Sequence, residues 1–215
     1  KIADADISNE SFKWLSMQEI PIGFCPKVRA MRVNFVGSLG WELHHPIEYQ
    51  LQLFEALQEA GAEFEIKNVG MRAMDSMRLE KSYRLWGTDL NAENSALEAN
   101  LHRFIKLNKG EFTGRQALVE QQEQGVPNKF CTIEIEANDA DSFGNEPIII
   151  DGKVVGRGTS GGYGHFIRKS LMLGYIESSH ANIGQECQVR LLDKLLPAKI
   201  IAESPYDPEN IALKA

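Results

Sequence analysis

The sequence predicts an α+β domain over residues 1–125 followed by a smaller all-β domain over residues 126–215. Up to residue 125, segments with the 3.6-residue period of amphipathic helices are mixed with segments that alternate like strands. After Val126-Pro127, short alternating strands predominate. Several such strands with glycine turns in under ~100 residues predict a small barrel or sandwich.

A pair of strands is expected early in the first domain. Apolar and polar residues alternate from Val28, and the apolar positions continue through Val33 and Phe35, which predicts a strand over 28–37. Ser38-Leu39-Gly40 then forms a turn, and WELHH at 41–45 returns as the second strand.

Three helical segments complete this domain. The first covers 46–61, with Pro46 near its first position and Gly61 as its stop. The second covers 70–83, and the third, over 114–125, is polar and ends at a glycine. Ile47, Leu51, Phe54 and Leu57 form an apolar stripe on the first helix, and Met71, Met74, Met77 and Leu79 form one on the second, where we expect core packing.

The second domain begins with KFCTIEIEA at 129–137, where apolar and polar residues alternate. Asp151-Gly152 lies between two apolar runs within 146–160, which is the strongest short-range signal for a hairpin. SLMLGYIES at 170–178 and the stretch from 188 to 206 supply further strands.

The segment GRGTSGGYG at 156–164 has the G-x-G-x-x-G spacing of a dinucleotide-binding loop. Such a loop needs a buried parallel strand before it and a long helix after it, whose N-terminus faces the pyrophosphate. Here the preceding strand is one arm of the Asp151-Gly152 hairpin, and HFIRKS is too short for a helix before the next strand. We therefore interpret these glycines as a cluster of β-turns.

Composition and charge narrow the class of protein. A formal net charge of −7 without a run of Lys or Arg argues against nucleic acid and anionic membranes as partners. Three scattered cysteines with no C-x-x-C pair indicate reduced thiols and no zinc site. No apolar run reaches the ~20 residues of a membrane helix. Because the chain opens with KIADADISNESF and no Met, we expect a fragment that lacks its N-terminal part.

Glu42 is the carboxylate that most resembles a binding group. It follows the predicted turn and lies between Trp41 and Leu43, so on a strand its side chain faces away from theirs. A carboxylate in that place faces solvent or binds a pair of donors. Its two oxygens suit a ligand with two parallel N–H groups, such as a pterin or a guanidinium. A strand glutamate that only faces solvent has the same pattern.

Other residues leave alternatives open. Phe35, seven residues before Glu42, is either a stacking platform for a flat ring or a core residue. His44 and His45 are adjacent and point opposite ways on a strand, so they cannot chelate a metal together. Asp89 either caps its turn or orients a neighbour. An ion-pair face on the helix over 70–83 accounts for Asp75, Arg78, Glu80 and Lys81.

The chain resembles the folate-binding aminomethyltransferase family, which includes the T-protein of glycine cleavage. The similar stretches are RVNFVGSLGWEL, GMRAMDSMRLEKSYRLWGTDL, ALEANLHRFIKLNKGEFTGRQAL, GRGTSGGYGHFIRKSLMLGYI and the closing SPYDPEN. RLEKSYRLWGTDL and SPYDPEN are most similar to the C-terminal region of dimethylglycine and sarcosine dehydrogenases. The resemblance implies part of a T-protein-like folate-binding domain over 1–125 and a C-terminal antiparallel β-barrel over 126–215.

The resemblance also implies a reaction for the whole polypeptide. An FAD domain in the missing N-terminal part would oxidise an N-methyl amine, and tetrahydrofolate would capture the one-carbon unit as 5,10-methylenetetrahydrofolate. Folate, the amine and the FAD domain of the same polypeptide are then the expected partners. The isolated fragment is expected to be inactive. The expected location of the protein is the cytoplasm or, alternatively, the mitochondrial matrix. Other readings are a fragment of a stand-alone aminomethyltransferase and a non-catalytic folate-binding module.

Site residues follow from the same resemblance. Glu42 is implied to bind the 2-amino and N3 edge of the pterin, Phe35 to lie beside the ring, and Tyr83 to fall in a turn near the site. The catalytic Asp of the family lies upstream of Lys1, so no catalytic residue is expected in this chain. T-proteins have an Arg where this chain has Met74; Arg72 or Arg78 are the candidate substitutes. Relatives that maintain iron–sulfur proteins carry a Cys at the position of Glu111, which argues against that branch.

Overall fold

The computed structural model describes residues 1–215 and divides them into two compact units. The first unit consists of Lys1–Met74 together with Glu209–Ala215, and the second of Asp75–Pro208. The first unit is therefore assembled from both ends of the sequence.

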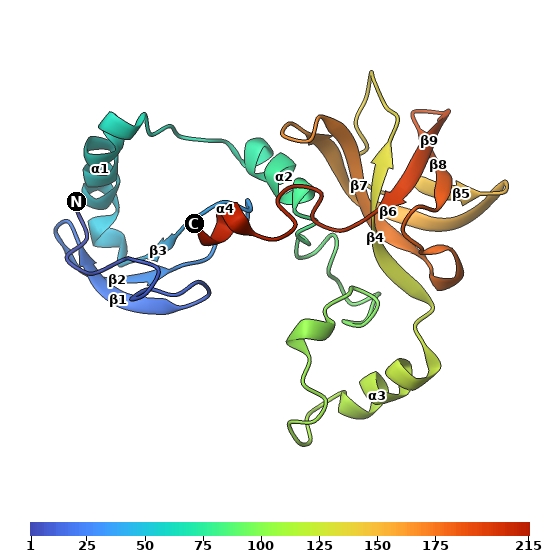
Figure 1. Ribbon diagram of the computed structural model, residues 1–215, viewed down its shortest axis with the longest axis horizontal. Coiled ribbons are helices and arrows are strands. Elements are labelled where there is room, and N and C mark those ends of the chain that lie inside the picture. The colour runs from blue at the N-terminus through green and yellow to red at the C-terminus, as the bar shows by residue number, and fades with distance from the viewer. The chain divides into compact units, whose positions relative to one another are not determined.

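The first unit contains a three-stranded antiparallel sheet in the order β1-β2-β3 (Figure 1). Its strands are β1 (Met17–Ile22), β2 (Cys25–Met31) and β3 (Glu42–His44). The predicted return strand at 41–45 is confirmed by β3. The preceding strand is shorter than the predicted span of 28–37, because β2 ends at Met31 and bends occupy residues 35–39.

The predicted helix over 46–61 is confirmed. It consists of η1 (Ile47–Tyr49) and α1 (Gln50–Gly61), and η2 (Ala62–Phe64) follows. The predicted stripe does not face the core as a whole. Leu53, one turn before the stripe residue Leu57, is 4% exposed and packs with the sheet, whereas the stripe residues Ile47, Leu51 and Phe54 are exposed.

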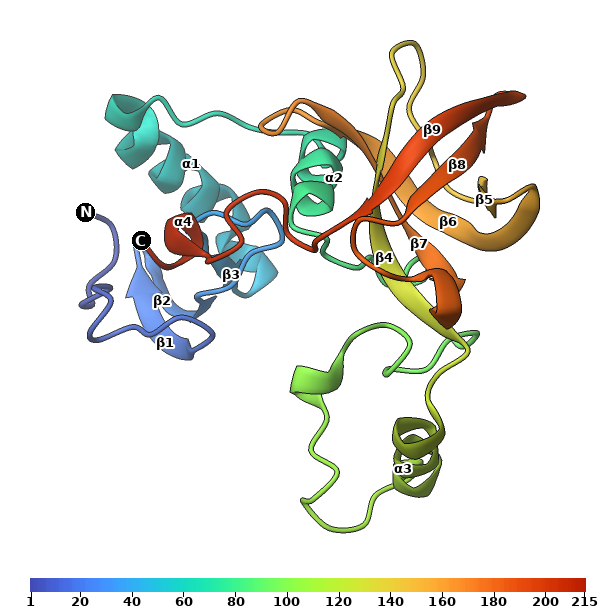
Figure 2. The same ribbon diagram turned by 45° about the vertical axis from the view of Figure 1, so that its right-hand side comes forward.

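The core of the first unit is small. Leu57 packs at its margin, and its buried members are Phe12, Ile20, Ile22, Cys25, Val28, Ala30 and Leu53. The short C-terminal helix α4 (Ile211–Lys214) lies beside this sheet in both views (Figure 2), with Leu213 buried.

Helix α2 (Met71–Glu80) confirms the second predicted helix, although its methionine stripe is only partly buried. Met71 is 74% exposed, which contradicts the expected core packing there, and Met74 and Met77 are half-buried. The fully buried positions lie in its last turn, at Arg78, Leu79 and Glu80. Burial increases along the helix because its C-terminal end enters the core of the second unit.

The second unit contains a closed antiparallel barrel in the strand order β4-β7-β6-β5-β8-β9, as the sequence predicted (Figure 1). The β5–β6 hairpin turns at Asp151 and Gly152, whose φ angles of 49° and 75° are those of a tight hairpin turn. The strands are β4 (Asn128–Ile135), β5 (Pro147–Ile150), β6 (Lys153–Gly164), β7 (Lys169–Glu177), β8 (Glu186–Leu191) and β9 (Lys194–Ile201).

Three shorter elements belong to the same unit. They are η3 (His102–Phe104), α3 (Arg115–Gln124) and η4 (Ser178–His180). Gly125 ends α3 with a φ of 84°, so the predicted polar helix and its stop are confirmed.

Both faces of β4 are buried, although its sequence alternates. Cys131 and Ile133 point into the barrel, where they join the larger core cluster. Phe130 belongs to a second cluster outside the barrel wall, which also contains Leu79 of α2 and Tyr175 of β7. The alternation of this strand therefore separates two cores rather than a core from solvent.

The glycines at 156–164 lie in β6 and not in a turn cluster. β6 is antiparallel to both β5 and β7, so the exclusion of a dinucleotide loop is supported while the β-turn interpretation is wrong. A Cβ at Gly158 would lie 2.5 Å from Met172 Sδ, and one at Gly164 would lie 2.9 Å from Glu80 Cγ. Close packing of neighbouring groups against the strand, rather than phosphate binding, therefore accounts for these glycines.

Candidate functional site

Glu42 projects from β3 on the side away from the core. Its neighbours Trp41 and Leu43 both pack against the core of the first unit, as the alternation predicted, and the Glu42 side chain is 52% exposed. Its Oε2 lies 3.2 Å from Nε2 of His44, which is on the same face two residues along. The carboxylate is therefore accessible to a ligand and has one ring nitrogen beside it.

Phe35 lies in the loop between β2 and β3 rather than on a strand, which corrects its predicted position. The Asn34 side chain causes this, because its Oδ1 accepts hydrogen bonds from the backbone N–H of Val36 at 3.0 Å and of Gly37 at 2.7 Å. A side chain that turns its own backbone in this way ends a strand. Phe35 is half-buried in the resulting bend.

The buried side chain of Arg32 fixes this loop at its start, a role that was not predicted. Its Nη1 donates to the carbonyl of Phe12 at 2.8 Å and its Nη2 to the carbonyl of Ala215 at 3.1 Å. The guanidinium also lies over the Trp41 ring, 5.8 Å from its centroid. A second tie comes from Leu39, whose N–H donates to a carbonyl of α4 at 3.0 Å. The C-terminal segment thus holds the loop that carries Phe35.

Tyr83 belongs to the second unit, whereas Glu42 and Phe35 belong to the first. It follows α2 and is held by Arg78, whose carbonyl accepts from the Tyr83 N–H at 2.9 Å and whose Nη1 donates to the Tyr83 carbonyl at 3.1 Å. Burial raises the pKa of the Tyr83 hydroxyl, and the nearby charge of Arg103 partly offsets this. The phenol therefore remains a neutral hydrogen-bonding group.

A buried ion pair organises the turn after Tyr83. Arg78 Nη1 lies 2.7 Å from Asp89 Oδ2, and these side chains are 2% and 0% exposed. Asp89 also accepts from the Leu85 N–H at 2.8 Å and from Ser160 Oγ of β6 at 2.6 Å, and Thr159 Oγ1 donates to it as well. Asp89 therefore caps its turn through the Leu85 N–H and also holds the Arg78 guanidinium, so it has both of the roles that the sequence left open.

The predicted ion-pair face on α2 is only partly correct. Arg78 Nε does lie 2.6 Å from Asp75 Oδ1, but Glu80 and Lys81 are about 1% exposed and serve as buried anchors. Oε1 of Glu80 accepts from the N–H of Phe166 at 2.7 Å. Nζ of Lys81 donates to the carbonyl of Asp207 at 2.7 Å, in the SPYDPEN segment. The charged groups of Glu80 and Lys81 therefore bind backbone groups and are not available to a ligand.

Arg72 and Arg78, the candidate substitutes for the family arginine at Met74, differ in whether their guanidinium groups are already paired. Met74 is half-buried on α2. Arg78 is fully committed to the buried network described above. Arg72 is exposed and has no ion pair in the structure. Of the two arginines considered, Arg72 is therefore the one with a guanidinium available to a ligand.

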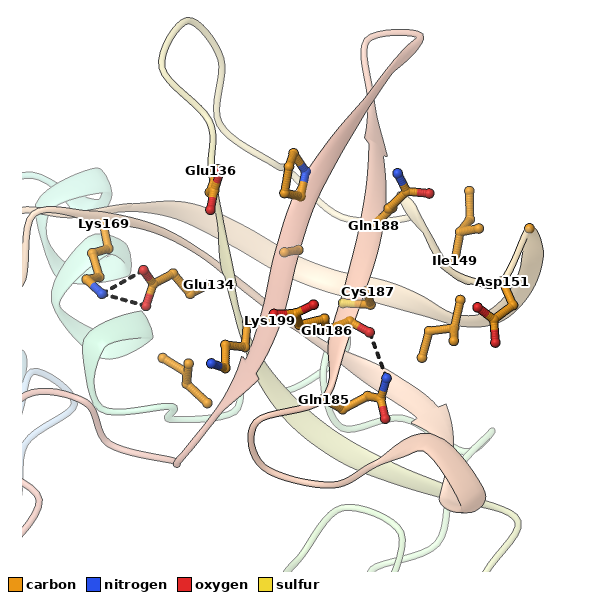
Figure 3. A pocket seen from close by; sticks show the side chains of 15 residues that line it. Glu134, Glu136, Ile149, Asp151, Lys169, Gln185, Glu186, Cys187, Gln188 and Lys199 are labelled. Atoms are coloured by element: carbon orange, nitrogen blue, oxygen red, sulfur yellow. Dashed lines mark hydrogen bonds and ion pairs between the residues drawn. The ribbon is translucent and has the colours of Figure 1, made fainter.

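The barrel has an open groove of about 1020 Å³, lined mainly by charged and polar groups. Figure 3 shows the bidentate contact of Lys169 with Glu134, at 2.6 and 2.7 Å, at one end and Asp151 at the other. Lys199 lies between them, opposite Glu186 in the β8–β9 register. The lining is net acidic, because it has only two cations, Lys169 and Lys199, and the four carboxylates of Glu134, Glu136, Asp151 and Glu186.

The three cysteines are free and buried. Burial raises the pKa of Cys131 to about 12 and that of Cys187 to about 11. A thiol of such a pKa is protonated and weakly nucleophilic near neutral pH. The structure contains no group of three or more His, Cys, Asp or Glu side chains that could hold a metal ion. None of its helices has the length and apolar character needed to span a bilayer.

Comparison with known families agrees with this architecture. Residues 1–109 match the GCVT N-terminal domain, and residues 128–207 match the glycine cleavage T-protein C-terminal barrel domain. The chain belongs to the glycine cleavage T-protein family, which confirms the resemblance found in its motifs.

Individual relatives include two mitochondrial dehydrogenases. The chain is 40% identical over 204 residues to mitochondrial dimethylglycine dehydrogenase of Homo sapiens, a match that covers 94% of this chain and 23% of the relative. It is 36% identical over 222 residues to mitochondrial sarcosine dehydrogenase of Homo sapiens, covering 100% of this chain and 24% of the relative. The chain thus spans about a quarter of the length of these curated relatives.

A solved structure shares the fold. The crystal structure of glycine cleavage system aminomethyltransferase T from Bartonella henselae matches with a TM-score of 0.79 and 23% sequence identity. The match covers 87% of this chain and 53% of that chain. The predicted fold, a partial T-protein-like domain followed by an antiparallel barrel, is therefore confirmed.

Proposed function

We propose that this chain is the tetrahydrofolate-binding C-terminal part of an FAD-dependent dehydrogenase of the dimethylglycine/sarcosine type. The observation that carries the proposal is the 40% identity to dimethylglycine dehydrogenase across 94% of the chain, which includes the Glu42 strand. In such an enzyme, this part receives the one-carbon unit and transfers it to tetrahydrofolate, giving 5,10-methylenetetrahydrofolate. The mitochondrial names of both relatives favour the mitochondrial matrix over the cytoplasm.

Glu42 is the residue we assign to the pterin edge. Its exposed carboxylate can accept two parallel N–H bonds, from the 2-amino group and N3, and such charge-assisted pairs are short and directional. Phe35, held in its bend by Asn34, would lie against the ring. Tyr83 would contact the folate through its phenol. None of these groups has to form or break a covalent bond, so their role is to bind and orient the acceptor.

The flavin chemistry is assigned to another part of the polypeptide. The chemistry that FAD would supply there is the oxidation of the N-methyl amine to an iminium. N5 of tetrahydrofolate would then add to the iminium carbon, the demethylated amine would leave, and closure at N10 would complete 5,10-methylenetetrahydrofolate. The glycine segment of this chain does not fit FAD, because it forms β6 between two antiparallel strands and lacks the following helix.

The mass and visible spectrum of the native polypeptide that carries this chain provide the first test. A protein of about four times this length with flavin absorption bands is expected if the proposal is correct. A colourless protein of about twice this length would instead favour a stand-alone aminomethyltransferase. A colourless protein that binds folate without transferring a one-carbon unit would favour a non-catalytic folate-binding module.

Glu42→Gln tests the assigned pterin contact. The amide offers an N–H group where the ligand also offers one, so the affinity of the native polypeptide for tetrahydrofolate should fall about 5- to 150-fold, from an unpaired donor costing about 1–3 kcal/mol. Glu48→Gln is the matched control, since it removes one exposed carboxylate from η1 of the same unit. Equal affinities of the two variants by calorimetry would remove Glu42 from the site.

A further inference from the structure

Three sides of the segment formed by η1 and α1 carry different kinds of side chain. One side packs on the sheet through Leu53 and Leu57. A second side is polar and exposed, and consists of Glu48, Gln52, Glu55 and Glu59. A third side is apolar but also exposed, and consists of Ile47, Leu51 and Phe54, which follow one another at the spacing of helical turns. A helix that meets a single core needs one apolar side, so the contacts of the first unit do not account for this third side.

The exposed apolar side extends beyond the end of the helix. Ile47, Leu51 and Phe54 are 79%, 66% and 42% exposed. Gly61 comes about two turns after Phe54 and therefore lies on the same side. Ile66 folds back onto this glycine, because its N–H donates to the Gly61 carbonyl at 3.1 Å and a Cβ at Gly61 would lie 2.8 Å from Ile66 Cβ. Ile66 is 41% exposed and continues the apolar surface, and we refer to Ile47, Leu51, Phe54 and Ile66 as the outer stripe.

The charges around the outer stripe narrow the kind of surface that can cover it. Contiguous exposed apolar patches mark sites of contact with another protein surface or with a membrane. Residues 46–66 contain five glutamates and no Lys or Arg. These glutamates would repel anionic lipid headgroups, and two copies of the same acidic face would repel each other. An apolar protein surface with few acidic residues is therefore the suitable cover.

The start of the chain lies beside one end of the outer stripe. Lys1 forms an ion pair with Glu63, and its Nζ lies 5.4 Å from the ring centroid of Phe64. Both of these partners belong to η2, which follows α1 directly (Figure 1). Residues that precede Lys1 in a longer polypeptide therefore begin within reach of the outer stripe.

The proteins similar to this chain contain such further residues. The match covers 23% of human dimethylglycine dehydrogenase and 53% of the T-protein in the crystal structure. Under the proposed function, the rest of the polypeptide precedes Lys1. A surface that is covalently joined to the chain has a high effective concentration at the outer stripe, so it competes well against separate partners.

We propose that the outer stripe is the docking surface for the part of the polypeptide that immediately precedes Lys1, and that this part covers the stripe with apolar side chains of its own. The inference rests on the proposed function for the order of the parts in the polypeptide, but not for the flavin. It gives α1 a second packing partner, so Leu51 and Phe54 belong to a buried interface within one polypeptide.

Thiol labelling of the native polypeptide measures whether the outer stripe is covered. Leu51→Cys places a thiol in the stripe, and Gln52→Cys places the matched thiol on the adjacent polar side. A covered thiol reacts only when the interface opens, so Leu51→Cys should be labelled at least about 100-fold more slowly than Gln52→Cys. Mass spectrometry of the peptide around residue 51 separates these rates from those of other cysteines. Equal rates for the two variants would overturn the inference.

A photoreactive residue identifies the cover and keeps the inference testable if Leu51→Cys does not fold. Phe54 is replaced by p-benzoylphenylalanine in the native polypeptide, and the peptides joined on irradiation are identified by mass spectrometry. We expect a cross-link within one molecule to a peptide that precedes Lys1. The same replacement at Glu55, on the polar side, is the matched control and should give no such product. A cross-link to residues 1–215 of the same molecule, a product of doubled mass, or no cross-link would each overturn the inference.

These outcomes are distinct from those that test the proposed function. A native polypeptide with flavin bands in which Leu51→Cys is labelled as fast as Gln52→Cys would overturn the inference and leave the proposed function intact. A colourless polypeptide whose upstream part protects Leu51→Cys would overturn the flavin assignment and support the inference. A native polypeptide with no residues before Lys1 would overturn both.

Discussion

Replacement of Asp89 by Asn should destabilise the second unit severely. The change removes the negative charge but little volume, and it leaves Arg78, 2% exposed, without its buried counterion. Removal of one partner of a buried pair costs about 3–5 kcal/mol, because the remaining charge stays desolvated. The exposed contact of Arg78 with Asp75 offsets only part of this cost, since that partner is 49% exposed. Tyr83 should lose its support as well, because Arg78 also donates to its carbonyl.

Equilibrium unfolding in urea measures the effect. With a slope of about 2 kcal/mol per molar urea, the midpoint of D89N should fall by about 2 M. Glu93→Gln is the control, since its ion pair with Arg157 at 2.9 Å joins two exposed side chains and should contribute about 0–1 kcal/mol. Ser160→Ala removes one hydrogen bond to Asp89 and should give an intermediate loss of about 1–3 kcal/mol, so the series remains measurable if D89N does not fold. Similar small losses for D89N and E93Q would refute the assignment of Asp89 as a buried anchor.

Other predictions concern the barrel. The free energy of unfolding should decrease from about pH 9 upwards, because three groups hold their protons more tightly in the folded than in the unfolded chain. Their folded pKa values are about 12 for Tyr175 and Cys131 and about 11 for Cys187. Urea midpoints measured between pH 7 and 10.5 should therefore fall, and a constant midpoint would show that burial of these three groups does not control the pH dependence. A thiol reagent should label Cys131 and Cys187 at pH 8 only on unfolding, so rapid labelling of the native chain would show that the barrel opens. Gly156→Ala should destabilise by more than about 1 kcal/mol, because the new Cβ would meet the Tyr175 carbonyl. At Gly70→Ala nothing lies within 4 Å, and calorimetric melting should show no loss.

Local patterns predicted most elements of the fold. Asp151-Gly152 predicted a hairpin because few residue pairs adopt positive φ at two consecutive positions, as the tight turn requires. Glycine at 125 marked the end of α3, where its φ of 84° ends the helix without a tertiary contact. α1 also ends at Gly61, but the chain continues as η2 and the left-handed residue that follows it is Glu65. The length of the strand before Phe35 could not be predicted from alternation, since the Asn34 side chain, and not hydrophobicity, ends it.

Burial was harder to predict than the elements themselves. A helical stripe shows which residues share a face, but not which face meets the core, so Leu53 was missed while Leu51 is exposed. Charged residues on α2 were expected at the surface, because charges are rarely buried unless they are paired. The partners of the Glu80 carboxylate lie far along the chain, next to β6, and the sequence contains no local sign of them. The counterion of Arg78, Asp89, lies eleven residues away, beyond the reach of a helical repeat.

The candidate site was only partly accessible from the residues alone. Alternation placed Glu42 on the outer face of its strand, and the structure agrees. The residues alone allowed a pterin or a guanidinium at Glu42 and a stacking or a core role for Phe35; the choice of the pterin and of stacking, and any role of Tyr83, came from the resemblance, and they stay predictions. Arg32 could have been noticed as a cation within an otherwise apolar alternation, but its partners near residue 215 could not.

The tie between Arg32 and the C-terminal segment affects the order in which the protein can fold during synthesis. Residues 209–215 leave the ribosome after the whole barrel sequence, yet they contribute the buried Leu213 and three carbonyl partners to the first unit. The barrel strands pair only among themselves and can close as soon as β9 has emerged. Although domains generally fold in the order of translation, here the first unit must wait for residues 209–215, and a nascent chain stalled just after the barrel would expose the unfinished loop that carries Phe35.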